Sequence, residues 1–320
     1  MTTINEPLIS IIIINFNGKS FLQKCLESIY DNEYLNYEII LVDNHSDDQS
    51  VPFVKANYPK VRITSLEKNF GFAEPNNIGA KQARGNFLYF LNNDTIISKD
   101  SLKELVKSFN DIEISIAQSL LLNEDNSIDS SGDFITTNCI AYSSQENSKT
   151  IKPIFSPRGA AFMIKKGVFW ELDGFDEKFF ASFEDVDLGW RAWLCGYKVV
   201  LVPKSIVHHM GGQTVKKLET EIQFHGIKNT LILSLTNFET NYSIKCLFSL
   251  LGLLFQKKIS IKDNLKTSKR KLSIPSFKIL FRGILWIIKN SGYVRNKRNK
   301  INSKRVISTK ELIRKGLIKN

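Results

Sequence analysis

The chain has 320 residues, of which 42% are hydrophobic and 24% are charged. This composition is typical of a globular protein and excludes an intrinsically disordered one, and the length allows one large domain with an appendage or two modest domains. The four cysteines are widely spaced and form no C-x-x-C pair. A zinc-stapled or disulfide-rich secreted fold is therefore not expected, and the protein is predicted to be cytoplasmic.

The net charge of +12 is unevenly distributed. Residues 257–320 hold 20 of the 44 Lys and Arg but only two of the 32 Asp and Glu, so this segment carries +18 and the remainder −6. A strongly basic segment attracts either nucleic acid or an anionic membrane surface. The high apolar content of the same segment favours the membrane.

The pattern of residues 275–289 predicts an amphipathic helix suited to a membrane surface. The apolar residues recur at helical spacing and the basic residues share another face: Phe277, Leu280, Phe281, Ile284, Ile287 and Ile288, and Lys278, Arg282 and Lys289. This pattern is typical of a helix lying in a membrane interface, and a helix packed on the protein with a solvated basic side is the alternative. No stretch reaches the roughly 18 to 20 uncharged residues needed to span a bilayer. The sequence therefore predicts peripheral association with the inner face of the cell membrane and no binding to nucleic acid.

Alternating strand and helix patterns fill the first third of the chain. Met1–Pro7 lacks a basic n-region, so the Ile-rich run Leu8–Ile14 is expected to be a strand buried on both faces of a parallel sheet rather than a signal peptide. The following segments predict, in order, a helix, a strand, a helix, a strand, a helix and a strand: 21–30, 37–44, 47–57, 61–66, 75–84 and 87–91. Such alternation is typical of a doubly wound α/β sheet.

The later part of the chain is less regular. Residues 110–156 are polar and predict loops and short strands, before a buried strand at 159–164. A helix is expected to begin at the acidic cluster Glu184-Asp185-Val186-Asp187 and to end at Leu194. Short strands at 199–202 and 206–209 and helices from Lys216 onward complete the prediction.

Polar residues follow three of the predicted strands, at Asn15-Phe16-Asn17, Asp43-Asn44 and Asn92-Asn93-Asp94. The carboxyl ends of parallel strands share one edge of a sheet, so these clusters should converge. The chain has no dinucleotide fingerprint and no P-loop, so a divalent cation, Mg²⁺ or Mn²⁺, on Asp94 is the expected way to hold phosphates. Asp94 as a turn residue and Asp185 as a charge at a helix start are the structural alternatives.

Seven short motifs occur in a characteristic order: 14–18, 41–47, 69–73, 91–95, 174–177, 184–191 and 209–214. In these motifs the chain resembles the family 2 glycosyltransferases, and within them the rhamnosyltransferase-like branch that builds bacterial surface polysaccharides. The resemblance runs from about Ile9 to Asn237. It implies the GT-A fold, a Rossmann-like and mostly parallel sheet, for a catalytic domain over residues 1–230. Residues 231–320 are then a helical, basic, membrane-associating extension.

The resemblance also implies roles for individual residues. Asp43 is placed where the family binds the nucleotide base, and the other residues assigned to nucleotide binding are Asn15, Asn17, Asn69, Asn77, Asn92 and Asn93. Asp94 and His209 correspond to metal ligands, with His208 as the alternative histidine. Asp185 corresponds to the catalytic base, with Glu184 beside it. Asp187 and Arg191 are supporting residues, for which a plain ion pair between positions i and i+4 is the alternative.

The implied activity is inverting, metal-dependent transfer of a sugar from a nucleotide-diphosphate donor to a polysaccharide or lipid-linked acceptor. Two departures from the family pattern stand out: Asn92 replaces the first Asp of the D-x-D motif, and Glu74-Pro75 replaces small residues. A sugar nucleotidyltransferase and a non-catalytic protein with a nucleic-acid-binding tail are the alternatives. The first of these usually carries a Gly-rich basic loop after its first strand, which Asn15-Phe16-Asn17-Gly18 is not.

Overall fold

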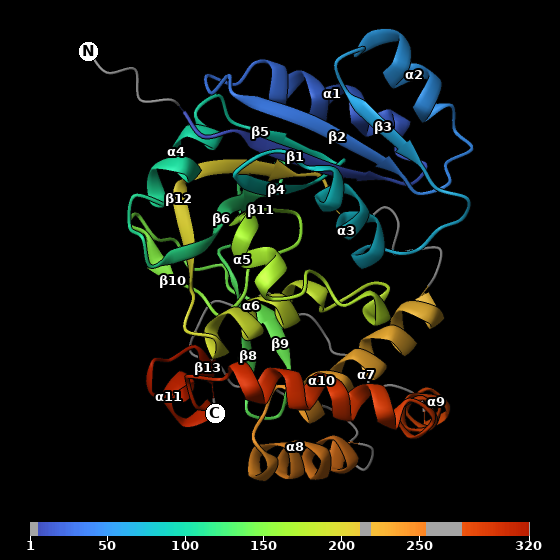
Figure 1. Ribbon diagram of the computed structural model, residues 1–320, viewed down its shortest axis with the longest axis vertical. Coiled ribbons are helices and arrows are strands. Elements are labelled where there is room, and N and C mark those ends of the chain that lie inside the picture. The colour runs from blue at the N-terminus through green and yellow to red at the C-terminus, as the bar shows by residue number, and fades with distance from the viewer. Residues whose placement is uncertain (1–5, 212–218, 254–276, 320) are drawn as a thin grey trace.

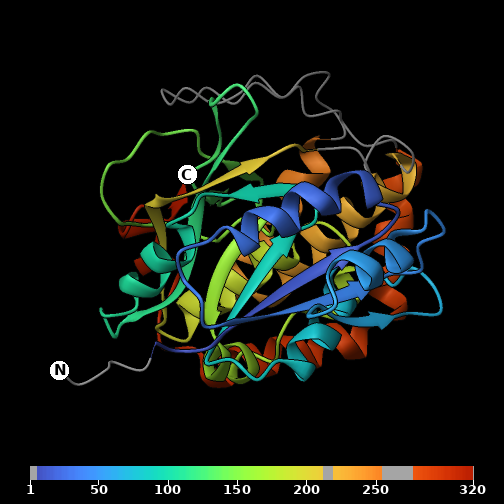
Figure 2. The same ribbon diagram turned by 90° about the horizontal axis from the view of Figure 1, so that it is seen from above.

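A mixed β-sheet with helices on both faces forms the body of the protein (Figures 1 and 2). The structure is a computed structural model that describes residues 6–211, 219–253 and 277–319. The strands are β1 (Ile9–Asn15), β2 (Tyr37–Asp43), β3 (Arg62–Ser65), β4 (Phe87–Asn92), β5 (Thr95–Ile97), β6 (Ile114–Leu122), β7 (Ile128–Ser130), β8 (Asp133–Thr136), β9 (Ala141–Ser143), β10 (Lys152–Pro153), β11 (Ala161–Lys165), β12 (Lys198–His209) and β13 (Ile318–Lys319). The helices are α1 (Lys19–Tyr30), α2 (Ser50–Asn57), α3 (Ala73–Gln82), α4 (Ser101–Ser108), α5 (Lys166–Glu171), the 3₁₀ turn η1 (Glu177–Phe179), α6 (Glu184–Leu194), α7 (Glu219–Thr236), α8 (Thr240–Leu253), α9 (Phe277–Lys289), α10 (Ser291–Lys304) and α11 (Thr309–Arg314).

The central strand β1 shows why two helical layers form. Its side chains alternate between the two faces of the sheet. Ile9, Ile11 and Ile13 are fully buried in a cluster with residues of α1, α2 and α4. Ile12 points the other way, into a second cluster that holds residues of α3, α5 and α6. Burial on both faces explains the continuous Ile run, as expected from the sequence.

The sheet is parallel where the sequence predicts it to be and mixed beyond that. The strand order is β10-β12-β6-β11-β4-β1-β2-β3, and the β1–β2, β1–β4 and β2–β3 pairs are parallel. Strand β11 runs antiparallel to both of its neighbours, β4 and β6. The predicted α/β fold class is therefore confirmed, with an antiparallel strand next to the parallel half.

Two predictions in the middle of the chain were wrong in detail. Residues 110–156 contain β6, a nine-residue buried strand in the middle of the sheet, instead of only loops and short strands. Its three polar residues Ser115, Gln118 and Ser119 hid the strand from a hydrophobicity pattern, yet all three are buried. The two short strands expected at 199–209 form one strand, β12, whose register shifts between Val202 and Ile206.

The C-terminal helices pack on the same core as the sheet. Ile232, Phe238 and Leu312 belong to the cluster that contains Phe90 of β4, and β13 pairs in parallel with β8. The boundary expected at residue 230 falls inside α7, and the expected helix start at Lys216 lies outside the described residues. Figure 1 shows α10 crossing below α6, with α8 at the far end of the long axis from α1 and α2.

Helix α9 is more buried than an interfacial helix should be. Leu280, predicted on the outward apolar face, is 5% exposed, and Gly283 lies against Ile227 and Leu231 of α7. Phe277 and Phe281 on the same predicted face are 72% and 52% exposed. The helix therefore packs on the protein along one side and presents aromatic residues to solvent on the other. None of the helices in the described residues is long and apolar enough to cross a bilayer.

Candidate active site

The polar residues that follow β1, β2 and β4 converge, as the sequence predicts. The Asn15 amide donates to Asp43 Oδ1 at 3.1 Å and to Ser46 Oγ at 3.0 Å. The Asn93 amide donates to Asn15 Oδ1 at 2.8 Å, and the backbone N–H of Ser46 donates to Asp43 Oδ2 at 3.0 Å. The parallel register pairs Asn15 directly with Asp43, which puts both side chains at one edge. This edge is where open α/β sheets bind ligands.

The turn after β1 is tightly packed against this cluster. Asn17 adopts a left-handed backbone conformation with φ 51°, and its Oδ1 accepts from the backbone N–H of Asp47 at 2.8 Å. A Cβ on Gly18 would lie 2.0 Å from the Asn93 amide nitrogen. A larger residue there would displace the Asn93 and Asn15 side chains and so disturb their hydrogen bond.

Asn69 belongs to a second group beside this cluster. The Asn44 amide donates to Asn69 Oδ1 at 2.9 Å and to the Gly71 carbonyl at 2.8 Å, and Asn69 Oδ1 also accepts from the Gly71 N–H at 2.8 Å. Asn44 is buried and was not assigned a role from the sequence. It follows Asp43 directly, so it connects the Asn69 segment to the end of β2.

Asn77 is not part of this convergence. Its amide nitrogen donates to the Phe175 carbonyl at 2.8 Å and to Glu177 at 3.1 Å, and its Oδ1 accepts from the Phe175 N–H at 2.9 Å. These bonds tie α3 to the Phe175–Glu177 turn. A structural role thus accounts for both polar ends of the Asn77 side chain.

Asp94 and His209 lie side by side. Asp94 Oδ1 is 3.5 Å from His209 Nε2, and the two side chains are 15% and 13% exposed. On the other side of the ring, His209 Nδ1 lies 2.9 Å from Asp129 Oδ2. Burial alone would lower the pKa of His209, but hydrogen bonds to Asp129 and Asp94 outweigh it and raise the pKa to about 9. Asp129 was missed in the sequence because it stands in the polar stretch expected to be irregular.

The Asp94–His209 pair fits a divalent cation as two of its ligands. A carboxylate and an imidazole suit Mn²⁺ or Mg²⁺, and neighbouring ligand atoms of an octahedral ion with bonds of about 2.0–2.1 Å lie about 3 Å apart. Asp129 holds the opposite ring nitrogen, which is the usual way to present Nε2 to a metal. Over residues 6–211, 219–253 and 277–319 no group of three or more His, Cys, Asp or Glu could hold one ion, because Asp94 and Asp129 contact opposite sides of the ring. A cation would therefore need further ligands from a diphosphate and water.

Asp185 lies in the first turn of α6 and is connected to the end of β4 through Gly159 and Ala160. Its Oδ2 accepts from the Gly159 N–H and its Oδ1 from the Val186 N–H, both at 2.7 Å. The next residue, Ala160, accepts from the Asn92 N–H at 2.9 Å. Two adjacent backbone groups thus connect the carboxylate of α6 to the strand end that carries Asp94.

The electrostatic environment of Asp185 suits a general base. Burial and the nearby Asp133 raise its pKa to about 6, although Arg158 and the two N–H groups act in the opposite direction. The neighbouring Glu184 is 7% exposed, and its Oε2 has no hydrogen-bond partner among the described residues. Burial and the charge of Asp185 raise the pKa of Glu184 well above its ordinary value. A carboxyl group with a pKa of about 6 is ionised at neutral pH and can accept a proton there.

Arg158 is a charged residue of this region that the sequence did not single out. Its guanidinium lies 3.5 Å from Asp133 Oδ2 and donates to Ser143 at 2.8 Å. Its charge also acts on Asp185 and Asp129. The positive charge of Arg158 therefore acts both on Asp185 and on Asp129, the partner of His209.

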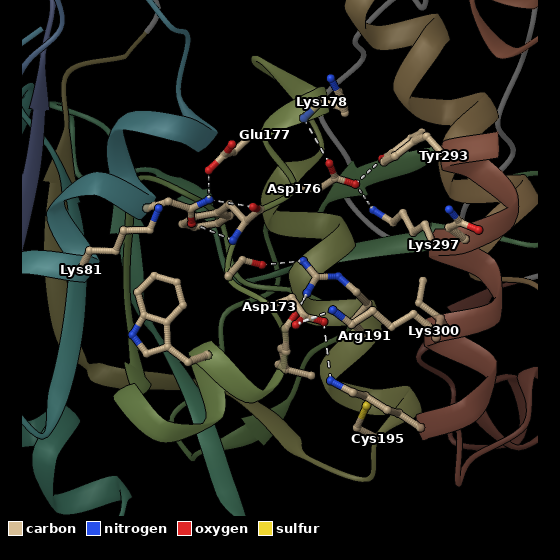
Figure 3. Close-up of a pocket in the computed structure, with 18 residues that line it drawn as sticks. Lys81, Asp173, Asp176, Glu177, Lys178, Arg191, Cys195, Tyr293, Lys297 and Lys300 are labelled. Atoms are coloured by element: carbon tan, nitrogen blue, oxygen red, sulfur yellow. Dashed lines mark hydrogen bonds and ion pairs between the residues drawn. The ribbon is translucent and has the colours of Figure 1, made fainter. Parts of the chain in front are cut away.

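Asp187 and Arg191 point away from Asp185, toward the C-terminal helix α10. Asp187 is fully buried, accepts from Arg191 Nε at 2.7 Å and lies 3.0 Å from Lys297 Nζ. Lys297 also pairs with Asp176, which in turn accepts from Tyr293, as Figure 3 shows. Burial would raise the pKa of Asp176, but Lys297 and Tyr293 hold it below its ordinary value.

Asp176, Arg191 and Lys297 line a cavity of about 650 Å³ between the 172–178 segment and α10 (Figure 3). Lys300 Nζ lies 2.7 Å from Asp173 Oδ1 at its rim. The ion pair expected between positions 187 and 191 is present. It belongs to a buried network that joins α6 to α10, not to the cluster around Asp43 and Asp94.

The comparison of sequences points to one family. Residues 10–173, more than half of the 320-residue chain, match glycosyl transferase family 2. An uncharacterized glycosyltransferase of Haemophilus influenzae is 34% identical over 103 residues, which cover 31% of this chain and 41% of that protein. The O-antigen biosynthesis protein RfbC of Myxococcus xanthus is 27% identical over 222 residues, which cover 63% of this chain and 17% of that protein. The matches thus span less than half of these relatives' own lengths.

The comparison of structures agrees on the fold. The crystal structure of GalNAc-T7 with UDP, GalNAc and Mn²⁺ is similar with a TM-score of 0.63 at 18% identity, over 91% of this chain and 58% of that one. The predicted GT-A architecture is thereby confirmed. Since the family match covers more than half of a chain with this fold, the protein belongs to glycosyl transferase family 2.

Proposed function

We propose that the protein is an inverting glycosyltransferase that moves a sugar from a nucleotide-diphosphate donor to a hydroxyl group of an acceptor glycan. The observation that supports this proposal is the backbone connection between Asp185 and the end of β4. Gly159 and Ala160, adjacent in the chain, bond to Asp185 and to Asn92 respectively. A base with a pKa near 6 thus stands beside the strand end that carries Asp94.

Different residues are assigned to nucleotide binding, to proton transfer and to metal binding. Asp43, with Asn15, Asn17, Asn93 and the Asn69 segment, forms the polar surface for the nucleotide. Asp185 accepts the proton of the attacking hydroxyl, a role typically contributing roughly 10²- to 10⁴-fold to the rate. A divalent cation held by Asp94 and His209 would stabilise the charge that develops on the departing diphosphate. Attack from the Asp185 side, opposite the leaving group, inverts the anomeric configuration.

The proposal extends to the substrates and the location. Similarity to the O-antigen biosynthesis protein RfbC supports a role in cell-surface polysaccharide synthesis at the cytoplasmic membrane face, with a polysaccharide or lipid-linked acceptor. The donor sugar would be rhamnose, another deoxysugar or a hexose. UDP and Mn²⁺ in the GalNAc-T7 structure support a nucleotide-diphosphate sugar and a divalent metal. Membership of this family argues against a nucleotidyltransferase and against a nucleic-acid-binding protein.

Nucleotide release from a panel of UDP-, dTDP- and GDP-sugars tests the proposed activity. One donor is expected to respond in the presence of Mn²⁺ or Mg²⁺, with loss of release on adding a chelator. Asp94→Ala should reduce release strongly, because it removes the only carboxylate on the Nε2 side of His209 among the contacts described. Asp111→Ala, which removes an exposed carboxylate paired with Lys198, is the control. Metal-independent release, or pyrophosphorolysis of the sugar nucleotide in its place, would contradict the proposal.

Membrane association is proposed to use the exposed side of α9. Phe277, Phe281 and Ile288 are 72%, 52% and 63% exposed, and Lys278 and Lys289 on the same helix are exposed too. Aromatic residues beside lysines suit an anionic lipid surface.

Sedimentation with vesicles containing anionic phosphatidylglycerol tests this surface. The double variant Phe277→Asp/Phe281→Asp is expected to bind at least about tenfold more weakly than the wild type. Ile112→Asp is the matched control, since Ile112 is an apolar residue that is 84% exposed in the turn between α4 and β6. Equal binding of all three proteins would exclude this face as the membrane contact.

A further inference from the structure

The loop before Asp185 has an unusual backbone. Phe180, Ser182 and Phe183 all adopt left-handed conformations, with φ of 57°, 73° and 70°, although none of them is glycine. Such conformations cost of order 1–3 kcal/mol each and persist only where the surroundings hold them. Because Glu184 and Asp185 follow directly, the position of the proposed base depends on this loop.

One side chain of α7 holds the loop. The Asn229 amide nitrogen donates to three of its backbone carbonyls: Phe179 at 3.0 Å, Ala181 at 3.0 Å and Ser182 at 2.6 Å. Asn229 is fully buried. The adjacent Lys228 donates to the carbonyl of Lys178. Two consecutive residues of α7 therefore hold the carbonyls of one short segment.

The orientation of the Asn229 amide is fixed by its surroundings. Its Oδ1 is buried and has no hydrogen-bond partner among the described residues. If the amide were reversed, Oδ1 would face three carbonyl oxygens and repel them. The unpaired oxygen is the consequence of directing both amide hydrogens at the loop.

The same loop also contacts the donor side of the site. The Phe180 carbonyl accepts from the Phe72 N–H at 2.5 Å, and a Cβ on Gly71 would lie 2.2 Å from that carbonyl oxygen. His225, one turn before Asn229 on α7, stacks on the Phe180 ring with centroids 4.9 Å apart. The loop thus contacts both α7, through His225, and the segment that follows Asn69, through Phe72.

We propose that Asn229 is a positioning residue: it fixes the 179–183 loop and, through it, the direction of the Asp185 carboxylate relative to the donor. This inference rests on the proposed function, in which Asp185 is the base. Asn229 touches neither Asp185 nor the strand-end cluster in any contact described, so its effect passes through the loop. Helix α7 lies beyond residues 10–173, which match the family, so a residue outside the matched segment would affect the rate of the reaction.

Asn229→Asp is the sharpest test, because the side chain keeps its shape but loses both hydrogens and sets a carboxylate against three carbonyls. With the responsive donor, kcat is expected to fall at least about tenfold while the donor KM changes less than about threefold, and the low-pH limb of kcat should shift. Asn229→Ala removes the donors without adding charge and should act in the same direction. Thr236→Val is the matched control on the same helix, because it removes buried hydrogen bonds to the Ile232 carbonyl and to Asn237 Oδ1, neither of which reaches the 179–183 loop.

Amide hydrogen exchange gives a reading that does not depend on activity. Exchange in residues 178–185 is expected to be at least about tenfold faster in Asn229→Asp than in the wild type, and unchanged in Thr236→Val. Unaltered exchange in the loop would overturn the inference even if the wild type proved to be an active transferase. If exchange in the loop is faster in Asn229→Asp but the wild type has no transferase activity, the result supports the contact between Asn229 and the loop and contradicts the proposed function. A loss of kcat in the Thr236→Val control equal to that in Asn229→Asp would also overturn the positioning role of Asn229.

Discussion

Replacing Asp185 with Asn is expected to reduce sugar transfer about 10²- to 10⁴-fold, because the amide cannot accept the proton of the attacking hydroxyl. Donor binding should stay close to that of the wild type. Asn15, Asp43 and Asn93 bond to one another at the ends of β1, β2 and β4, whereas the Asp185 carboxylate bonds to Gly159 and Val186. Transfer kinetics together with calorimetric titration of the donor would measure the two effects separately.

The pH dependence follows from the same carboxylate. With a pKa of about 6, Asp185 is ionised above that pH and protonated below it. The value of kcat/KM should therefore fall about tenfold for each pH unit below 6. The same raised pKa means that protonation of Asp185 stabilises the fold, an effect fully present near pH 3 and lost as the pH rises through 6. At pH 8 the ionised carboxylate is unfavourable for folding, whereas the amide that replaces it in Asp185→Asn can accept from only one of the two backbone N–H groups that the carboxylate binds. These two effects oppose each other, so the free energy of unfolding in urea is expected to change little in Asp185→Asn.

Asp111→Asn serves as the control for this variant, since Asp111 is exposed and pairs with Lys198 rather than with a residue of the strand-end cluster. Its kinetics should match those of the wild type. Full transfer activity in a folded Asp185→Asn variant would exclude Asp185 as the base.

Replacing Lys297 with Met should destabilise the protein by about 3–5 kcal/mol, because it leaves buried carboxylates without their shared cation. The Lys297 side chain is 10% exposed and pairs with Asp176 and with the fully buried Asp187. Arg191 alone would then balance Asp187. Urea unfolding followed by circular dichroism would measure the loss of folding free energy.

A neighbouring lysine on the same helix gives the control. Lys300 pairs with Asp173 at 2.7 Å, but its side chain is 56% exposed and that of Asp173 is 47% exposed. Exposed pairs contribute at most about 1 kcal/mol, so Lys300→Met should have little effect. Equal stability losses in the two variants would mean that the network between α6 and α10 does not hold the C-terminal helices on the core.

The strand-end site could be predicted because its causes are local. The Ile run of β1 and the apolar run of β4 are each followed by polar residues, and the parallel register then brings Asn15, Asp43 and Asn93 together. Sequence separation does not matter for this step, since the edge of a parallel sheet collects its strand ends. The helical pattern of 184–194 was likewise predicted from residue spacing, and the structure agrees.

Directions of side chains within the site were decided by partners far away in the chain. Asn77 turns to the backbone of Phe175, and Asp187 turns to Lys297, more than a hundred residues later. Residue type and helical spacing do not distinguish Asp187 from Asp185, because both are acidic residues in the first turn of α6, and only the resemblance to the family gave them different roles. Their different directions follow from the face of the helix that α10 covers.

By itself, the sequence determined the α/β class, the convergence of the strand ends and the family to which the chain belongs. Strand β6, the division of α9 between a packed and an exposed side, and the pairing of His209 with Asp129 were decided only by the tertiary structure. The hydrogen bonds from Asn229 to the loop before Asp185 were also decided only by the tertiary structure. The physical reason common to all four is that packing between distant segments chooses which side chains are buried and which partners they contact, and the periodicity of a single segment does not contain this information. Buried polar groups must find partners in particular, as Gln118 of β6, His209 and Asn229 do.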